Sequence, residues 1–209
     1  MSYDSTLWAT LEQWSPTVFL VAGGLFVLPT AIFGFGTATG VGNIVSPAVI
    51  FVLLLVVFVG LLGLYPRLAE AGSALALGGV VLLSVTAGVI LFTFGVVALP
   101  TGLTLGKPHI QAIITVVVVG STLTFATFGL ATRRTGVYSR LIGRSLQVMA
   151  AGNLSILIAM QVYGDPTPAW VGLVVGALFA IALGSIGYVL RTETPPVGRL
   201  ESTGDVTPD

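Results

Sequence analysis

The chain has 209 residues, of which 55% are hydrophobic and only 8% are charged, and its mean hydropathy is +1.04. Soluble domains carry about 25% charged residues, so this composition excludes a water-covered globule and indicates a membrane protein. The net charge of zero excludes the basic surface of a nucleic-acid-binding protein. The lack of cysteine excludes disulfides and thiolate metal sites.

Six apolar segments follow one another along the chain, and each is long enough to cross a bilayer, which takes about 20 helical residues. Backbone polar groups in lipid must be paired within the spanning structure, so these segments form helices or a closed barrel. Barrel strands alternate apolar and polar residues, and these segments do not. The sequence therefore predicts an all-α, six-helix transmembrane bundle with spans at Pro16–Phe35, Pro47–Tyr65, Ser73–Leu99, Pro108–Thr132, Arg140–Val162 and Pro168–Leu190.

Prolines mark several of the expected helix ends. Pro47, Pro108 and Pro168 each stand where a span begins, at a position where the backbone N–H would have no helical partner. Pro66 is expected just past the end of the second span. Pro29 lies inside the first span and should kink it.

The positive charges predict how the chain is oriented. Lys107 lies between the third and fourth spans, on the side opposite to the termini. All of the arginines lie on the side of the termini: Arg67, Arg133, Arg134, Arg140, Arg144, Arg191 and Arg199. Because cytoplasmic segments carry the excess of positive charge, we expect a multipass protein of the cell membrane with both termini in the cytoplasm.

The termini differ from the apolar region between them. Residues 1–15 should form a cytoplasmic segment, which is either a short interfacial helix or an extension of the first span, because Leu7, Trp8, Leu11 and Trp14 recur at helical spacing. Residues 16–190 form the expected transmembrane domain. Residues 191–209 are rich in threonine, proline, glycine and acidic residues, which predicts a disordered cytoplasmic tail.

The last span carries four small residues in steps of four: Gly172, Gly176, Ala180 and Gly184. Small residues at this spacing let another helix approach closely within a membrane. We therefore expect this face to pack against a helix, either within the chain or in a dimer or partner subunit.

The fifth span holds most of the polar side chains found within the spans. Arg144, Gln147 and Ser155 fall on one helical face, and Asn153 points the other way. Two interpretations remain open. The polar face crosslinks neighbouring helices through hydrogen bonds, or it lines a polar path for a substrate.

The middles of the spans contain no Asp, Glu, Lys, Arg or His. Ion-coupled transporters and proton pumps usually place ionisable residues there. His109 is the only histidine, so a haem held by two histidines and a zinc site of several histidines are excluded. No catalytic residue, metal ligand or cofactor is predicted, and an enzyme is the least favoured class.

The composition of the chain and one short segment resemble those of a known group of proteins. The chain prefers arginine to lysine, lacks cysteine and ends in an acidic, threonine-rich tail, and residues 63–69 read Gly-Leu-Tyr-Pro-Arg-Leu-Ala. In these respects it resembles uncharacterised small multipass membrane proteins of halophilic archaea. This resemblance implies a multipass membrane fold and supplies no functional residue.

Three functional classes follow. The first is a non-catalytic subunit or helix-packing partner of a membrane assembly, with the lipid bilayer and a second copy or other membrane subunits as partners. The second is a facilitator or channel for a small neutral solute. The third is an enzyme of lipid or envelope metabolism that uses His109 and Asp165 at the outer surface.

Overall fold

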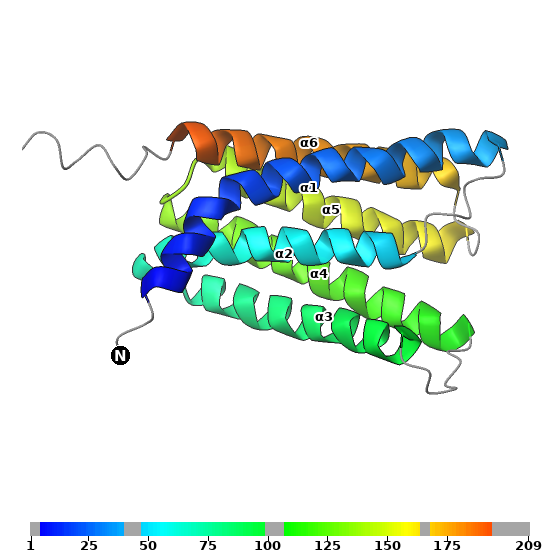
Figure 1. Ribbon diagram of the computed structural model, residues 1–209, viewed down its shortest axis with the longest axis horizontal. Coiled ribbons are helices and arrows are strands. Elements are labelled where there is room, and N and C mark those ends of the chain that lie inside the picture. The colour runs from blue at the N-terminus through cyan, green and yellow to red at the C-terminus, as the bar shows by residue number, and fades with distance from the viewer. Residues whose placement is uncertain (1–4, 40–46, 99–106, 164–167, 194–209) are drawn as a thin grey trace, which may run out of the picture.

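The computed structural model describes residues 5–39, 47–98, 107–163 and 168–193. These ranges contain six α-helices: α1 (Ser5–Thr39), α2 (Pro47–Glu70), α3 (Ala74–Ala98), α4 (Lys107–Thr135), α5 (Arg140–Tyr163) and α6 (Ala169–Glu193). Each helix contains a segment that is long and apolar enough to cross a membrane. The predicted all-α, six-span membrane fold is therefore confirmed (Figure 1).

Two helices depart from the expected bounds. α1 begins at Ser5 rather than Pro16, so the N-terminal segment and the first span form one continuous helix. Its first turns are inclined to the rest of the helix (Figure 1). α1 contains Pro16 and Pro29, and proline is a common cause of such a bend because it removes a backbone hydrogen bond. α2 continues through Pro66 to Glu70, so the prediction that Pro66 lies past its end is wrong. The burial of Leu64 and Leu68 holds this last part of α2 against the core.

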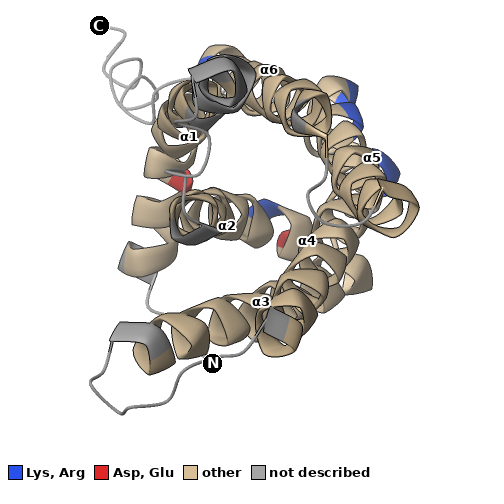
Figure 2. Ribbon diagram, turned by 90° about the vertical axis from the view of Figure 1, so that its right-hand side faces the viewer, with Lys and Arg blue, Asp and Glu red and all other residues tan. Residues whose placement is uncertain are grey.

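The six helices form a ring of neighbours in chain order. Each helix contacts the next one along the chain, and α6 contacts α1, which closes the ring (Figure 2). The contact between α1 and α6 is the most extensive of all. The first and last helices of the chain are therefore each other's main partners.

The two ends of the bundle differ in charge. The last turns of α2, α4 and α6 and the first turns of α5 carry the described arginines, and we call this end of the bundle the arginine end. α1 begins and α6 ends there as well (Figure 1). Lys107 begins α4 at the opposite end. The structure describes nothing beyond Glu193, so most of the predicted tail lies outside the described residues.

Apolar side chains both fill and cover the bundle. Phe19, Phe58, Phe125 and Phe128 are among the largest fully buried side chains. On the outside, large apolar side chains are also exposed, and Phe92 on α3 is 72% exposed. An apolar exterior is unfavourable in water but suits contact with lipid.

Candidate functional site

The small-residue face predicted on α6 comprises Gly172, Gly176, Ala180 and Gly184. In the structure this face lies against α1. A Cβ added to Gly23 of α1 would stand 2.9 Å from the backbone nitrogen of Gly184 and 3.1 Å from the carbonyl oxygen of Ala180. A Cβ added to Gly176 would collide with the Oγ1 of Thr30, also on α1. Gly172 is half-buried. Gly176, Ala180 and the backbone of Gly184 therefore pack against α1, whereas a Cβ added to Gly184 itself would meet no atom within 4 Å.

Two glycines of this contact were not predicted from the sequence: Gly23 on α1 and Gly187 on α6. Besides Gly23, the contact includes Gly187, where an added Cβ would stand 2.8 Å from the backbone nitrogen of Leu20 and the carbonyl oxygen of Pro16. At Gly23 the close neighbours are backbone atoms of α6, and at Gly187 they are backbone atoms of α1 together with the side chain of Leu20. A signal was present, because Gly187 extends the small-residue series on α6 by one turn.

The three residues of the predicted polar face on α5 have separate surroundings. Arg144 is exposed near the arginine end, and Ser155 is exposed and donates a hydrogen bond to the carbonyl oxygen of Ala151 at 2.9 Å. Gln147 is half-buried, and its Oε1 accepts a hydrogen bond from Nη1 of Arg133 on α4 at 2.9 Å. Within this face, Gln147 therefore crosslinks two helices.

Asn153 makes the most deeply buried polar contact of α5. Its side chain is only 5% exposed, and its Nδ2 donates a hydrogen bond to the Oγ of Ser121 on α4 at 2.9 Å. The hydroxyl of Ser121 in turn donates to the carbonyl oxygens of Val117 and Val118 at 2.7 and 3.1 Å. A buried amide in an apolar bundle needs such a partner, because an unpaired polar group is costly there.

Towards the arginine end, α4 and α5 also touch through glycines. A Cβ added to Gly129 would stand 3.1 Å from the carbonyl oxygen of Gly143, and one added to Gly143 would stand 3.1 Å from the carbonyl oxygen of Gly129. The two helices are thus held together at the Gly129–Gly143 contact and again at the Asn153–Ser121 hydrogen bond.

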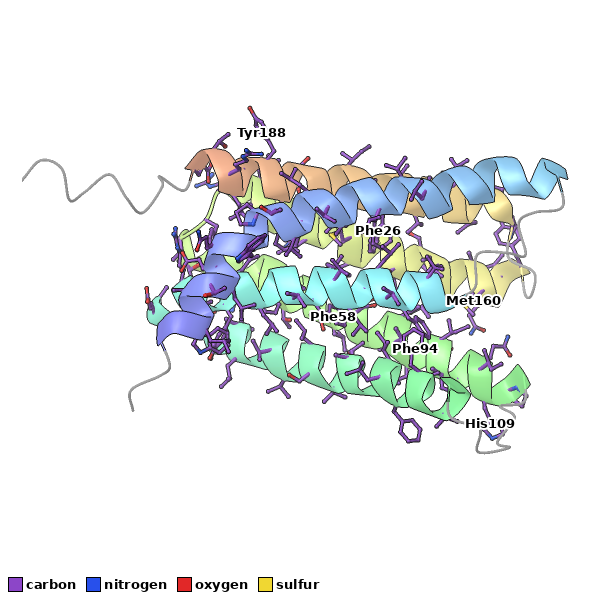
Figure 3. The ribbon with its side chains drawn as sticks, in the orientation of Figure 1. Phe26, Phe58, Phe94, His109, Met160 and Tyr188 are labelled. Carbon is purple, nitrogen blue, oxygen red and sulfur yellow. The ribbon has the colours of Figure 1, made fainter. Side chains whose placement is uncertain are left out.

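Four phenylalanines from four helices meet in the interior of the bundle. The ring of Phe179 lies 5.4 Å from that of Phe26 and 5.8 Å from that of Phe125, and Phe125 lies 6.4 Å from Phe58. All four are buried, and Phe26 and Phe58 extend between helices (Figure 3). These rings, which we call the phenylalanine cluster, fill the space between α1, α2, α4 and α6 with apolar side chains.

At the arginine end, one arginine connects three parts of the chain. Arg67 of α2 forms an ion pair with Glu12 of α1, and its guanidinium lies 5.9 Å from the ring centre of Tyr138, which precedes α5. The Tyr138 hydroxyl donates a long hydrogen bond, 3.4 Å, to the carbonyl oxygen of Leu64. Burial raises the pKa of Tyr138 above its ordinary value, and Arg67 partly opposes this rise. The phenol therefore stays neutral at physiological pH.

A hollow of about 370 Å³ lies between the first turns of α4 and the last turns of α5, at the end opposite to the arginines. We call it the α4–α5 hollow. It is lined by Pro108, Gln111, Ala112, Thr115, Leu157, Met160 and Gln161. None of these residues was predicted to form a site, because no periodic sequence pattern marks where two helices separate.

The residues of the enzyme hypothesis are only partly described. His109 is exposed in the first turn of α4, on the outside of the bundle (Figure 3), and Asp165 lies outside the described residues. Among the residues that the structure describes, no three His, Cys, Asp or Glu side chains come together as metal ligands would.

Comparison with known proteins found no matching family model, no matching curated protein and no matching solved structure. The resemblance to membrane proteins of halophilic archaea therefore stays a prediction.

Proposed function

We propose that the chain is a non-catalytic membrane protein that works as a subunit of a membrane assembly, and that it associates with a second copy of itself through α3. The observation that carries this proposal is the outward face of α3. Most of the small-residue face of α6, the first candidate from the sequence, lies against α1. α3, in contrast, carries three glycines at which an added Cβ would meet no atom within 4 Å.

The outward face of α3 has a regular spacing. Its residues are alternately four and three apart, which is the spacing of a seam between two supercoiled helices: Ala74, Gly78, Val81, Val85, Gly88, Phe92 and Gly95. Gly95 is half-buried, and the other six are exposed. A Cβ added to Gly78, Gly88 or Gly95 would meet no atom within 4 Å.

The neighbouring glycine gives a useful contrast. A Cβ added to Gly79 would stand 2.8 Å from the ring of Phe128 on α4, so Gly79 is explained by packing within the chain. Gly78 and Gly88 have no such partner. Glycine is disfavoured in helix interiors, and small residues on an exposed face of a membrane helix support close approach of another helix.

A second copy is the occupant that this pattern fits. Two copies inserted in the same direction are related by rotation about the membrane normal, so identical residues stand at equal depth. Gly78 would face Gly78, and Gly88 would face Gly88, which allows close contact at two levels. Val81 and Val85 would pack between these levels.

The interior of the bundle supports a non-catalytic role. The phenylalanine cluster places apolar rings in the interior of the bundle, where a reaction centre or a solute path would need polar groups. The buried amide of Asn153 is already paired with Ser121. These contacts are those of helix packing.

The test is the oligomeric state of the full chain in mild detergent and in lipid nanodiscs. Gly88→Leu should convert dimers to monomers, because the added side chain blocks close approach. Gly24→Leu is the matched control, since Gly24 is also exposed on its helix with no atom within 4 Å of an added Cβ. A monomeric wild type, or equal dimerisation of the two variants, would refute association through α3.

We further propose that the arginine end faces the cytoplasm, so that both termini lie there. The support is the placement of arginines in the last turns of α2, α4 and α6 together with the positive-inside rule. Because the chain lacks cysteine, single cysteines can report the sides. Ser139→Cys should resist an impermeant thiol reagent in intact cells, whereas His109→Cys, at an exposed position of the opposite end, should react; the reverse pattern would invert the orientation.

A facilitator for a small neutral solute is the second candidate, and the α4–α5 hollow favours it. A solute path that continued from this hollow through the middle of the bundle would have to displace the phenylalanine cluster. Liposomes that contain the purified protein should show no glycerol flux above empty liposomes under the first proposal. Flux that Gln161→Leu abolishes would instead support the facilitator.

A further inference from the structure

The α4–α5 hollow has a structural cause. α4 and α5 are held together at Gly129 and Gly143 and at Ser121 and Asn153. Beyond this last hydrogen bond, no further hydrogen bond joins the described parts of the two helices towards Lys107. Here α4 runs beside α3, where Gly120 packs on Thr86, and the near ends of α4 and α5 stand apart in Figure 2. The two helices therefore separate and leave a space between them.

The hollow combines two carboxamides with apolar side chains. Gln111 of α4 and Gln161 of α5 line it from opposite sides, and neither amide bonds to another described residue. The hydroxyl of Thr115 is already committed as a donor to the carbonyl oxygen of Gln111, at 2.9 Å. The apolar part of the lining comprises Pro108, Ala112, Leu157 and Met160. At about 370 Å³ the hollow reaches the range of small-molecule sites, roughly 300–1,000 Å³.

This lining selects for an uncharged polar group. None of the described residues that line the hollow is charged, whereas a phosphate group would call for arginine or lysine among them. A carboxamide offers both a donor and an acceptor, and an aliphatic hydroxyl group also donates and accepts. Two carboxamides on opposite sides, at Gln111 and Gln161, can therefore both bond to a ligand that carries hydroxyl or ester groups.

The depth of the hollow points to a lipid rather than a water-soluble polyol. The rings of Tyr163 and Trp170 meet at 6.3 Å at the same end of the bundle, and such aromatic pairs mark the boundary between headgroups and hydrocarbon. The hydroxyl of a neutral lipid lies at this boundary, while Leu157 and Met160 offer a surface for its hydrocarbon.

We infer that the α4–α5 hollow binds a neutral, hydroxyl-bearing lipid of the diacylglycerol type. Gln111 and Gln161 hydrogen-bond to its hydroxyl and ester oxygens, and the apolar residues of the hollow contact the start of its acyl chains. This site is independent of the proposed association through α3, since α3 contributes no residue to the lining.

The test uses the full chain in phosphatidylcholine nanodiscs with a photoactivatable diacylglycerol. Labelling should saturate, fall on α4 and α5, and be competed by unlabelled diacylglycerol. The double variant Gln111→Leu with Gln161→Leu should weaken binding about tenfold, because each lost hydrogen bond weakens it several-fold. Gln13→Leu, which removes an exposed amide from α1 outside the hollow, is the matched control and should bind as the wild type does.

A second pair of variants tests the space itself. Ala112→Phe should fill the hollow and reduce labelling, whereas Ala151→Phe, at an exposed position of α5 outside the lining, should not. Labelling that never saturates, labelling that survives both the double variant and Ala112→Phe, or competition by free glycerol would overturn the assignment. Loss of dimerisation in the Gly88→Leu variant should leave the labelling unchanged, which separates the two proposals.

Discussion

Asn153 of α5 donates a hydrogen bond to Ser121 of α4 in the buried interior of the bundle, at 2.9 Å. The bond lies between the Gly129–Gly143 contact and the α4–α5 hollow. It is therefore the last polar link before the two helices separate.

Asn153→Leu should lower the free energy of unfolding by about 0.6–2 kcal/mol, the range for hydrogen bonds between membrane helices. Unfolding by sodium dodecyl sulfate in mixed micelles measures this change. Ser155→Leu, at an exposed position on the same helix, should leave stability nearly unchanged. If Ser121→Ala and Asn153→Leu prove strictly additive in the double variant, the two side chains do not interact.

Two adjacent glycines of α1 should respond in opposite ways to the same change. Gly23→Ala places a Cβ 2.9 Å from backbone on α6, and such overpacking costs about 1–3 kcal/mol. Gly24→Ala meets no atom within 4 Å and should be neutral or stabilising by up to about 1 kcal/mol, because alanine favours the helix. The same denaturation assay measures both, and equal effects would contradict the α1–α6 packing.

Stability at high pH should depend on Tyr138. Burial raises the pKa of its hydroxyl in the folded protein, whereas the unfolded chain keeps a value of about 10. The folded state thus binds this proton more tightly, so its contribution to stability is complete below about pH 10 and is lost as the pH rises further.

Tyr138→Phe should therefore flatten the fall in unfolding free energy above about pH 10, while costing about 0.5–1 kcal/mol at neutral pH through its hydrogen bond to Leu64. Thermal unfolding at neutral pH and at a pH above about 10 measures both effects. Tyr163→Phe, at an exposed position, is the control, and an unchanged pH profile for Tyr138→Phe would contradict the buried position of the phenol.

Breaking the ion pair between Glu12 and Arg67 should lower the free energy of unfolding less than removing the Arg67 side chain does. Both partners are about one-third exposed, so Glu12→Gln should cost under about 1 kcal/mol and less in high salt. Arg67→Met should cost more, because it also removes the contact with the ring of Tyr138. Glu70→Gln, at an exposed position in the last turn of α2, is the control; a larger loss for Glu12→Gln than for Arg67→Met would contradict this ranking.

Hydropathy predicted the number of helices well, because a span needs about 20 apolar residues whatever it packs against. It predicted helix ends less well. Pro66 was expected to end α2, but the burial of Leu64 and Leu68 keeps the last turns helical. A proline costs one hydrogen bond near a helix end, and tertiary contacts can offset that loss.

The partners of each face were harder to predict. Gly176 and Gly184 were identified as a packing face, but their spacing is equally suited to α1 or to a second chain. The contact of Asn153 with Ser121 depends on the rotation of two helices about their axes, which no single-helix pattern determines. The hollow beside Gln111 and Gln161 exists only because two helices separate, and separation leaves no mark in a sequence of apolar residues.

The closing contact between α1 and α6 also bears on how the protein is made. Among the six described helices α1 is made first and α6 last, so their contact, the most extensive in the bundle, can form only after the other helices have been made. Until α6 is made, the backbone around Gly23 lacks the neighbour that it contacts in the finished bundle. A nascent chain cut short before α6 would lack the contact that closes the ring, and the apolar surface left uncovered would make it prone to aggregation.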